Sequence, residues 1–107
     1  MIRIIGILIS LFMAPDLLYA QDAGNPKEGL RLSREACATC HAVEAGQGRS
    51  PREQAPTFMR IAQTPGMTTT ALTVALRTSH KTMPNIMLEP RELRDVTAYI
   101  TSLNKKP

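Results

Sequence analysis

Apolar residues recur with helical spacing near the end of the chain. Four of them, separated by three or four residues, fall on one side of a helix: Leu93, Val96, Ile100 and Leu103. Pro90 suits the first turn of such a helix, and Glu89 and Glu92 lie near the end that favours negative charge. The pattern predicts a helix that begins near Pro90 and packs one apolar face against the rest of the protein.

Capping residues predict the start of an earlier helix. Asn25 can accept hydrogen bonds from the first free amides, and Pro26 suits the first helical position. Residues 27–36 then continue with Gly29 as the one helix-weakening residue. A surface loop rich in Gly, Pro, Ser and Gln is expected over residues 46–56.

Two shorter helices are predicted in the middle of the chain. Residues 57–62 can form a short helix that ends at the turn Thr64-Pro65-Gly66. Thr68 or Thr69 can cap the next helix, which should end near Ser79. One face of that helix is apolar and consists of Ala71, Leu72, Ala75 and Leu76. No strand pattern and no internal repeat is visible, so the sequence predicts a single all-α domain.

The N-terminus predicts a cleaved secretory signal, residues 1–20. Arg3 precedes an apolar run, residues 4–14, and Ala20 is a suitable cleavage position before a polar segment. The alternative is an uncleaved membrane anchor, but the run of 11 residues falls short of the roughly 20 that span a bilayer. The expected mature protein is residues 21–107, located in the periplasm, without stable membrane insertion.

Composition limits the classes of function. Residues 21–107 hold 12 basic and 8 acidic residues, because Arg3 and Asp16 leave with the leader, and the net charge stays at +4. This excess lacks a dense basic run with interleaved aromatics, so nucleic acid is not an expected partner. It suits docking to acidic redox proteins better. A chain this short with so few aromatic residues is expected to need a cofactor as part of its core.

The segment Cys37-Ala38-Thr39-Cys40-His41 carries the clearest chemistry. It contains both cysteines of the chain and one of its two histidines. Two thiols separated by two residues can each bond a vinyl group of one haem, and the following histidine can ligate the iron. The second ring nitrogen of such a histidine can be held by a backbone carbonyl. The motif therefore predicts one haem c, attached through Cys37 and Cys40 and ligated by His41.

Two other interpretations of the cysteines are disfavoured. A structural zinc site needs four ligands, and outside the motif His80 is the one remaining candidate among the cysteines and histidines. A thioredoxin-like dithiol would follow a strand in a βαβ unit, whereas the residues before Cys37 are predicted to be helical. The histidine directly after Cys40 favours haem attachment.

The sixth ligand of the iron is expected from the segment between the last two helices. Met83 is favoured because Pro84 stiffens the backbone after it, and a thioether is a ligand that raises the haem potential. His80 and Met87 are the other two candidates. His80 is expected to be exposed or to brace the loop, and the apolar neighbours of Met87 indicate a core position. Met59 and Met67 are expected to be core or loop residues.

The order of these elements resembles the class I c-type cytochromes over nearly all of residues 21–107. The haem motif, Met83-Pro84 and the segment 95–100 with Tyr99 carry most of the resemblance. It implies the all-α cytochrome c fold, with three to four short helices wrapped around one covalently bound haem. It also implies that the carbonyl of Pro56 accepts a hydrogen bond from His41, and that Gly29 lets the first and last helices cross closely.

The chain departs from that family at two points. An aromatic residue usually stands four positions before the first haem cysteine, where this chain has Ser33, and Leu30 or Leu32 is expected to replace part of its contact. The tryptophan that binds a haem propionate in many members is absent. The candidates for that role are Arg60, Arg77 and Lys81, although each is expected to be a solvated surface charge.

A one-electron carrier is the function that these features favour, and it is not an enzyme. With His41 and Met83 on the iron, no position is open for a substrate, and no other catalytic constellation is visible. The expected partners are a dehydrogenase or cytochrome complex as donor and an oxidase or other acceptor, and the carrier is expected to be a monomer. Two alternatives remain: a haem sensor or catalyst with a labile sixth ligand, and a haem-binding subunit of a larger oxidoreductase with Leu30 or Phe58 at its interface.

Overall fold

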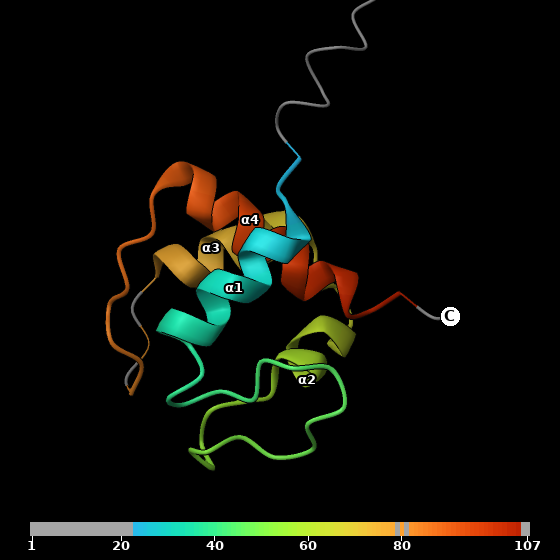
Figure 1. The fold of residues 1–107 in the computed structure, drawn as a ribbon, viewed down its shortest axis with the longest axis vertical. Coiled ribbons are helices and arrows are strands. Elements are labelled where there is room, and N and C mark those ends of the chain that lie inside the picture. Colours follow the sequence, from blue (N-terminus) through green and yellow to red (C-terminus); the bar gives the residue numbers. More distant parts are fainter. Residues whose placement is uncertain (1–22, 79, 81, 106–107) are drawn as a thin grey trace, which may run out of the picture.

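Four helices make up the computed structural model, which describes residues 23–78, 80 and 82–105. They are α1 (Pro26–Ala36), α2 (Phe58–Gln63), α3 (Thr69–Arg77) and α4 (Pro90–Ser102) (Figure 1). These residues include no β-strand, which confirms the predicted all-α class. The predicted leader lies outside the described residues.

Each of the first three helices begins after a residue whose side chain caps it, and the sequence predicts two of these caps, Asn25 and Thr68. The Asn25 side chain accepts a hydrogen bond from the amide of Lys27 at 3.0 Å. Thr57 caps α2 and Thr68 caps α3, each hydroxyl accepting from a backbone amide three residues on at 3.1 Å. These bonds satisfy amides that have no partner inside the helix. The predicted boundaries are therefore correct to within about two residues.

The start of α4 has a feature that charge alone does not predict. The amide of Glu89 donates to Oε1 of Glu92 at 3.0 Å, so Glu92 acts as a reciprocal cap in addition to its favourable position in the helix dipole. Pro90 occupies the first helical position, as predicted. The helix start is thereby fixed directly after the segment that contains Met83.

Helices α1 and α4 cross at very short range (Figure 1). A Cβ atom built on Gly29 would lie 1.9 Å from the backbone oxygen of Asp95 and 2.8 Å from Cβ of Tyr99. Gly24, just before α1, makes the same kind of approach, because its Cβ would lie 1.9 Å from the backbone oxygen of Arg94. Only glycine fits at either position, which confirms the role expected for Gly29.

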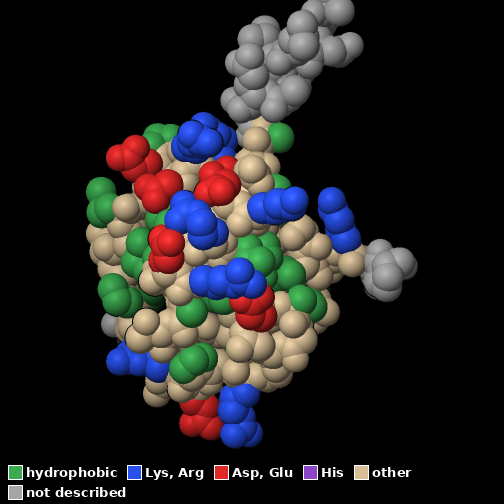
Figure 2. Space-filling model, in the orientation of Figure 1, with side chains coloured by type: hydrophobic (Ala, Val, Ile, Leu, Met, Phe, Trp, Pro, Cys, Tyr) green, Lys and Arg blue, Asp and Glu red, His purple; other side chains and the backbone are tan. Residues whose placement is uncertain are grey.

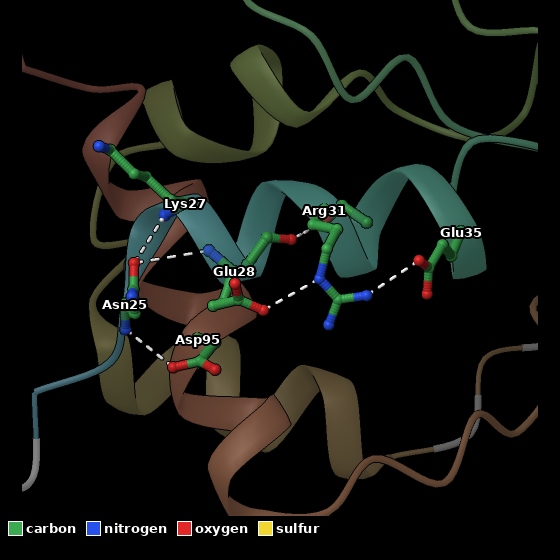
Figure 3. Close-up of polar contacts among 8 residues, drawn as sticks. Asn25, Lys27, Glu28, Arg31, Glu35 and Asp95 are labelled. Atoms are coloured by element: carbon green, nitrogen blue, oxygen red, sulfur yellow. Dashed lines mark hydrogen bonds and ion pairs between the residues drawn. The ribbon is translucent and has the colours of Figure 1, made fainter.

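Asn25 also ties the start of α1 to α4 (Figure 3). Its amide donates to Oδ1 of the buried Asp95 at 2.8 Å, while its side chain caps α1. One residue therefore serves both helices. Ser33 lies farther along the crossing and is fully buried, with its hydroxyl donating to the carbonyl of Gly29 at 2.7 Å. Leu30 and Leu32 pack against the core, as expected where the family's aromatic residue is missing.

Charged residues cover the outer face of α1. Arg31 pairs with Glu28 and Glu35, each at 2.9 Å, along the exposed side of the helix (Figure 3). Such exposed pairs contribute little to stability. In the space-filling view, positive and negative side chains are intermixed over this face (Figure 2). Neither sign of charge dominates this face.

The core gathers around α4, which contacts each of the other three helices. The buried residues of the core are Val43, Phe58, Ala62, Leu72, Val96, Tyr99 and Ile100.

Two predictions about buried and exposed residues are wrong. Met87 is not a core residue, because 85% of its surface is exposed, and its place in a loop before α4 turns it outward. Phe58 is not an exposed interface residue, because it lies on the buried side of α2 with only 4% of its surface exposed.

Replacing Gly29 by alanine is expected to lower the free energy of unfolding by about 2 kcal/mol, since a methyl group forced against a backbone oxygen must push α1 from α4. Urea unfolding of the haem-loaded protein, followed by circular dichroism, measures this loss. Gly48→Ala is the matched control, because a Cβ there meets nothing within 4 Å, and its effect should stay within about 0.5 kcal/mol. Equal effects of the two substitutions would contradict the account of the crossing.

Candidate functional site

An apolar cavity of about 440 Å³ lies between the cysteine motif, α3 and the segment before α4. This volume is typical of cofactor pockets, which measure about 300–1,000 Å³. The motif contributes Cys37, Cys40 and His41 to its wall, and the segment before α4 contributes Met83. Most of the remaining wall is apolar: Ala36, Ala55, Pro56, Phe58, Ile61, Met67, Leu72, Ala75, Leu76, Pro84, Ile86 and Ile100.

The end of α1 places the motif in the cavity wall. Cys37 is the C-cap of α1, with its amide bonded to the carbonyl of Ser33 at 2.8 Å. The chain then turns back on itself, since the amides of Cys40 and His41 donate to the Cys37 carbonyl at 3.1 and 2.9 Å. This turn brings the two thiols and the imidazole to one surface, as the spacing of the motif predicts.

His41 is held in one tautomer. Its Nδ1 atom lies 2.7 Å from the carbonyl oxygen of Pro56. A carbonyl can only accept, so Nδ1 carries the proton, and in the neutral ring Nε2 keeps its lone pair. The hydrogen bond that the family resemblance implies is thus present, and it leaves Nε2 as the ring nitrogen able to bind a metal.

The two thiols fit a haem-attachment site better than a redox-active dithiol, both in the pKa of Cys37 and in the element that precedes them. Burial, and secondarily the neighbouring Cys40, raises the pKa of the Cys37 thiol, whereas reactive dithiols have a lowered pKa. The structure places a helix before the motif, where a thioredoxin-like unit would have a strand. Among the described residues, no group of three or more His, Cys, Asp or Glu side chains is arranged to hold a metal ion, which also disfavours zinc.

The residues after the motif are fixed by contacts that the sequence did not predict. The amide of Ala42 donates to the Ser50 hydroxyl at 3.0 Å, and its carbonyl accepts from the amide of Phe58 at 2.9 Å. The Tyr99 hydroxyl donates to the carbonyl of Val43. A serine in a polar loop carries no sequence signal for such a role. Tyr99 does belong to the apolar stripe of α4, but its hydroxyl partner is 56 residues away in the chain.

An ion pair at the surface joins α1 to the residue that follows Val43. Arg34 of α1 binds both carboxylate oxygens of Glu44, with Nη2 and Oε2 3.1 Å apart. The hydrogen bond from Arg34 lowers the pKa of Glu44. Burial, with a smaller contribution from Glu44, raises the pKa of Tyr99. The phenol therefore stays protonated and able to donate over the physiological pH range.

Met83 and His80 both line the cavity. Met83 is half-buried, and its amide donates to the carbonyl of His80 at 3.3 Å. His80 is exposed, and its Nδ1 donates to the carbonyl of Thr78 at 2.9 Å, so it braces the loop as expected. Met87 is absent from the cavity lining. Of the three candidates for the sixth ligand of the iron, only Met83 and His80 line the cavity.

Two of the three candidate propionate partners are solvated surface charges, as expected. Arg60 and Arg77 are exposed and do not line the cavity, and Lys81 lies outside the described residues. Within the described part of the chain, Arg52 is the one lysine or arginine in the lining. Its amide donates to the Cys40 carbonyl at 3.1 Å, so it sits on the cysteine side of the cavity.

These residues fit haem c. A mostly apolar cavity suits the porphyrin ring, and two thiols in its wall suit thioether attachment. The lining also includes an imidazole whose Nε2 atom is free and a methionine, two side chains of the kinds that can ligate haem iron. The remaining lining offers no competing set of metal ligands among the described residues.

Comparison with known proteins agrees with this site. Residues 24–100 match the family model described as cytochrome c oxidase, cbb3-type, subunit III. The chain belongs to the class I c-type cytochromes. The cytochrome is also 31% identical to cytochrome c-552 of Bradyrhizobium diazoefficiens over 102 residues, which cover 95% of this chain and 94% of that protein. No solved structure matches it significantly.

Family membership establishes the cofactor and the general activity. Class I c-type cytochromes carry a covalently bound haem c, and Cys37 and Cys40 have the spacing of the attachment motif. The cytochrome is accordingly an electron-transfer protein that works with redox partner proteins. Within the part of the chain that the structure describes, no helix is both long and apolar enough to cross a membrane.

Proposed function

We propose that this cytochrome is an exported, monomeric one-electron carrier in which His41 and Met83 ligate the iron of the haem bound to Cys37 and Cys40. The observation that carries the proposal is the shared cavity: both cysteines, the imidazole and the thioether line it together. Pro56 belongs to the site through its hydrogen bond to His41.

Each of these residues has a defined chemical role. Haem c supplies a one-electron couple when it is bound. Pro56 fixes the ring orientation of His41 and makes its Nε2 a stronger donor. The Met83 thioether is a weak, soft ligand, which favours the reduced state and raises the potential. Two protein ligands leave no position for a substrate, which supports transfer of electrons over catalysis or gas sensing.

Met83→Ala is expected to abolish the sulfur-to-iron charge-transfer band of the oxidised protein and to lower the midpoint potential, because the thioether ligand is lost. The reduced variant should then bind carbon monoxide, while the reduced wild type should not. Absorption spectra and a potentiometric titration measure these changes.

Two variants serve as controls for this experiment. Met87→Ala removes a methionine that is 85% exposed and outside the cavity, so it should leave the band and the potential unchanged. His80→Ala should also keep the band. If Met83→Ala kept the band, or if the wild type bound carbon monoxide readily, the proposed ligation would be wrong.

Export through a leader of residues 1–20 is part of the proposal. Its support is the apolar run that ends in Ala20, and the usual attachment of haem c outside the bacterial cytoplasm. The alignment with cytochrome c-552 covers 95% of the chain and therefore extends into this run.

The mass of the exported protein tests the leader and the haem together. We expect the periplasmic fraction to contain residues 21–107 plus one haem that stays attached under denaturing conditions, since both thioether bonds are covalent. Intact-protein mass spectrometry measures this. A haem-loaded species that kept residues 1–20 would contradict cleavage, and a denatured chain without the added mass would contradict attachment.

A second candidate function is a subunit of a larger oxidase. The description of the matching family model, subunit III of a cbb3-type oxidase, favours it. Among the described residues, two large hydrophobic side chains are exposed and could contribute to a permanent interface, Val74 of α3 and Met87. A free carrier would instead dock through charges, and its net charge of +4 suits acidic partners.

Salt dependence separates the two candidates. A carrier docked by charge is expected to leave the membrane fraction at about 0.5 M salt, where the Debye length is only a few ångströms, and to elute as a monomer. An apolar subunit interface would persist at that salt concentration. Size-exclusion chromatography of salt-washed and detergent-solubilised membranes, followed by haem absorbance, measures this. Co-elution with the other oxidase subunits at high salt would overturn the carrier.

A further inference from the structure

The three residues that follow Cys40 are anchored to three separate parts of the fold. His41 is bonded through Nδ1 to the Pro56 carbonyl at 2.7 Å. Ala42 is bonded through its amide and its carbonyl to Ser50 and Phe58. Val43 is bonded through its carbonyl to the hydroxyl of Tyr99. Of these anchors, Tyr99 is the one that comes from α4.

Burial makes the bond between Tyr99 and Val43 important. Tyr99 is 6% exposed and Val43 is 2% exposed, so water has little access to either group. A buried carbonyl that loses its donor keeps the full penalty of desolvation. The conformation in which this bond is broken is therefore disfavoured, and the Val43 carbonyl stays oriented toward α4.

Aromatic contacts continue from Tyr99 to the imidazole. The rings of Tyr99 and Phe58 lie 6.4 Å apart, and those of Phe58 and His41 lie 5.5 Å apart, both pairs being tilted. Such arrangements are favourable for aromatic pairs. Phe58 also donates its amide to Ala42, so its ring and its backbone both contact the segment that Tyr99 anchors.

We propose that Tyr99 is a positioning residue for the proximal histidine, holding the 41–43 segment so that His41 Nδ1 keeps its hydrogen bond to Pro56. This inference rests on the proposed ligation of the iron by His41. Tyr99 reaches this segment from the crossing of α1 and α4, since its Cβ is one of the atoms nearest to Gly29. The helix crossing thus determines how firmly the imidazole is held and how strongly it donates to the iron.

Hydrogen exchange at the imidazole tests the proposal in the haem-loaded protein. Tyr99→Phe keeps the ring but removes the hydroxyl, and it is expected to accelerate exchange of the His41 Nδ1 proton about tenfold or more. Nitrogen-15 NMR of the reduced protein measures this rate. The midpoint potential should rise, because a weaker hydrogen bond at Nδ1 makes the ring a poorer donor to oxidised iron.

Val96→Ala is the matched control. Val96 is a buried residue of the same helix, 1% exposed, and its truncation destabilises the core without removing a hydrogen bond to the 41–43 segment. Exchange should be compared under denaturant concentrations at which the two variants have equal unfolding free energies. If Tyr99→Phe then matched Val96→Ala in exchange rate and potential, the role of Tyr99 would be purely structural and the proposal overturned.

A second modification should strengthen the hydrogen bond from Tyr99 instead of removing it. Tyr99 is the one tyrosine of residues 21–107, so biosynthetic 3-fluorotyrosine replaces it alone in the processed protein. The fluorine makes the hydroxyl a stronger donor, and exchange at His41 should become slower than in the wild type. An unchanged or faster rate would overturn the proposal. Failure of the proposed ligation by His41 is distinguishable, because the Nε2 signal of His41 in the unmodified reduced protein would then lack the nitrogen-15 shift that binding to iron produces.

Discussion

The close crossing of α1 and α4 is the constraint on which the rest of the molecule depends. Gly29 allows it, because any side chain there would collide with the backbone of Asp95. Asn25 locks it from the N-terminal side by joining the cap of α1 to the Asp95 carboxylate. Both helices lead directly to the site, since α1 ends at Cys37 while α4 contributes Ile100 to the cavity and Tyr99 to the support of His41.

The cavity explains why so small a chain can fold with so few aromatic residues. Its wall draws on the motif, α2, α3, α4 and the segment before α4, so a porphyrin within it would contact most of the protein. Burial of that apolar surface would add to a core that has only Phe58 and Tyr99 as large aromatic members. The cofactor of this family is thus expected to serve both as the redox centre and as part of the hydrophobic core.

Much of this arrangement is predictable from local chemistry. Asn25 and Thr68 identify helix starts because a cap depends on only a few neighbouring residues. The cysteine motif is equally local. The predicted core position of Met87 is wrong, since 85% of its surface is exposed. Apolar neighbours in the sequence do not reveal which way the side chains of a loop face.

Contacts between distant segments were the part that could not be predicted. The bond from Tyr99 to Val43 spans 56 residues, and that from Asn25 to Asp95 spans 70. Arg52 lines the cavity because its loop is bonded to the motif, through the hydrogen bond from the Arg52 amide to the Cys40 carbonyl. Arg60 and Arg77 do not line the cavity. Such pairings depend on how the helices pack, and a single sequence carries no local pattern for them.

The central claim is that the iron lies between the imidazole of His41 and the thioether of Met83. X-ray absorption at the iron edge of the purified protein tests it most directly, because it counts the sulfur atoms bound to the metal. Five nitrogen ligands and one sulfur ligand are expected in both oxidation states. Six nitrogen ligands, or five ligands without sulfur, would contradict it.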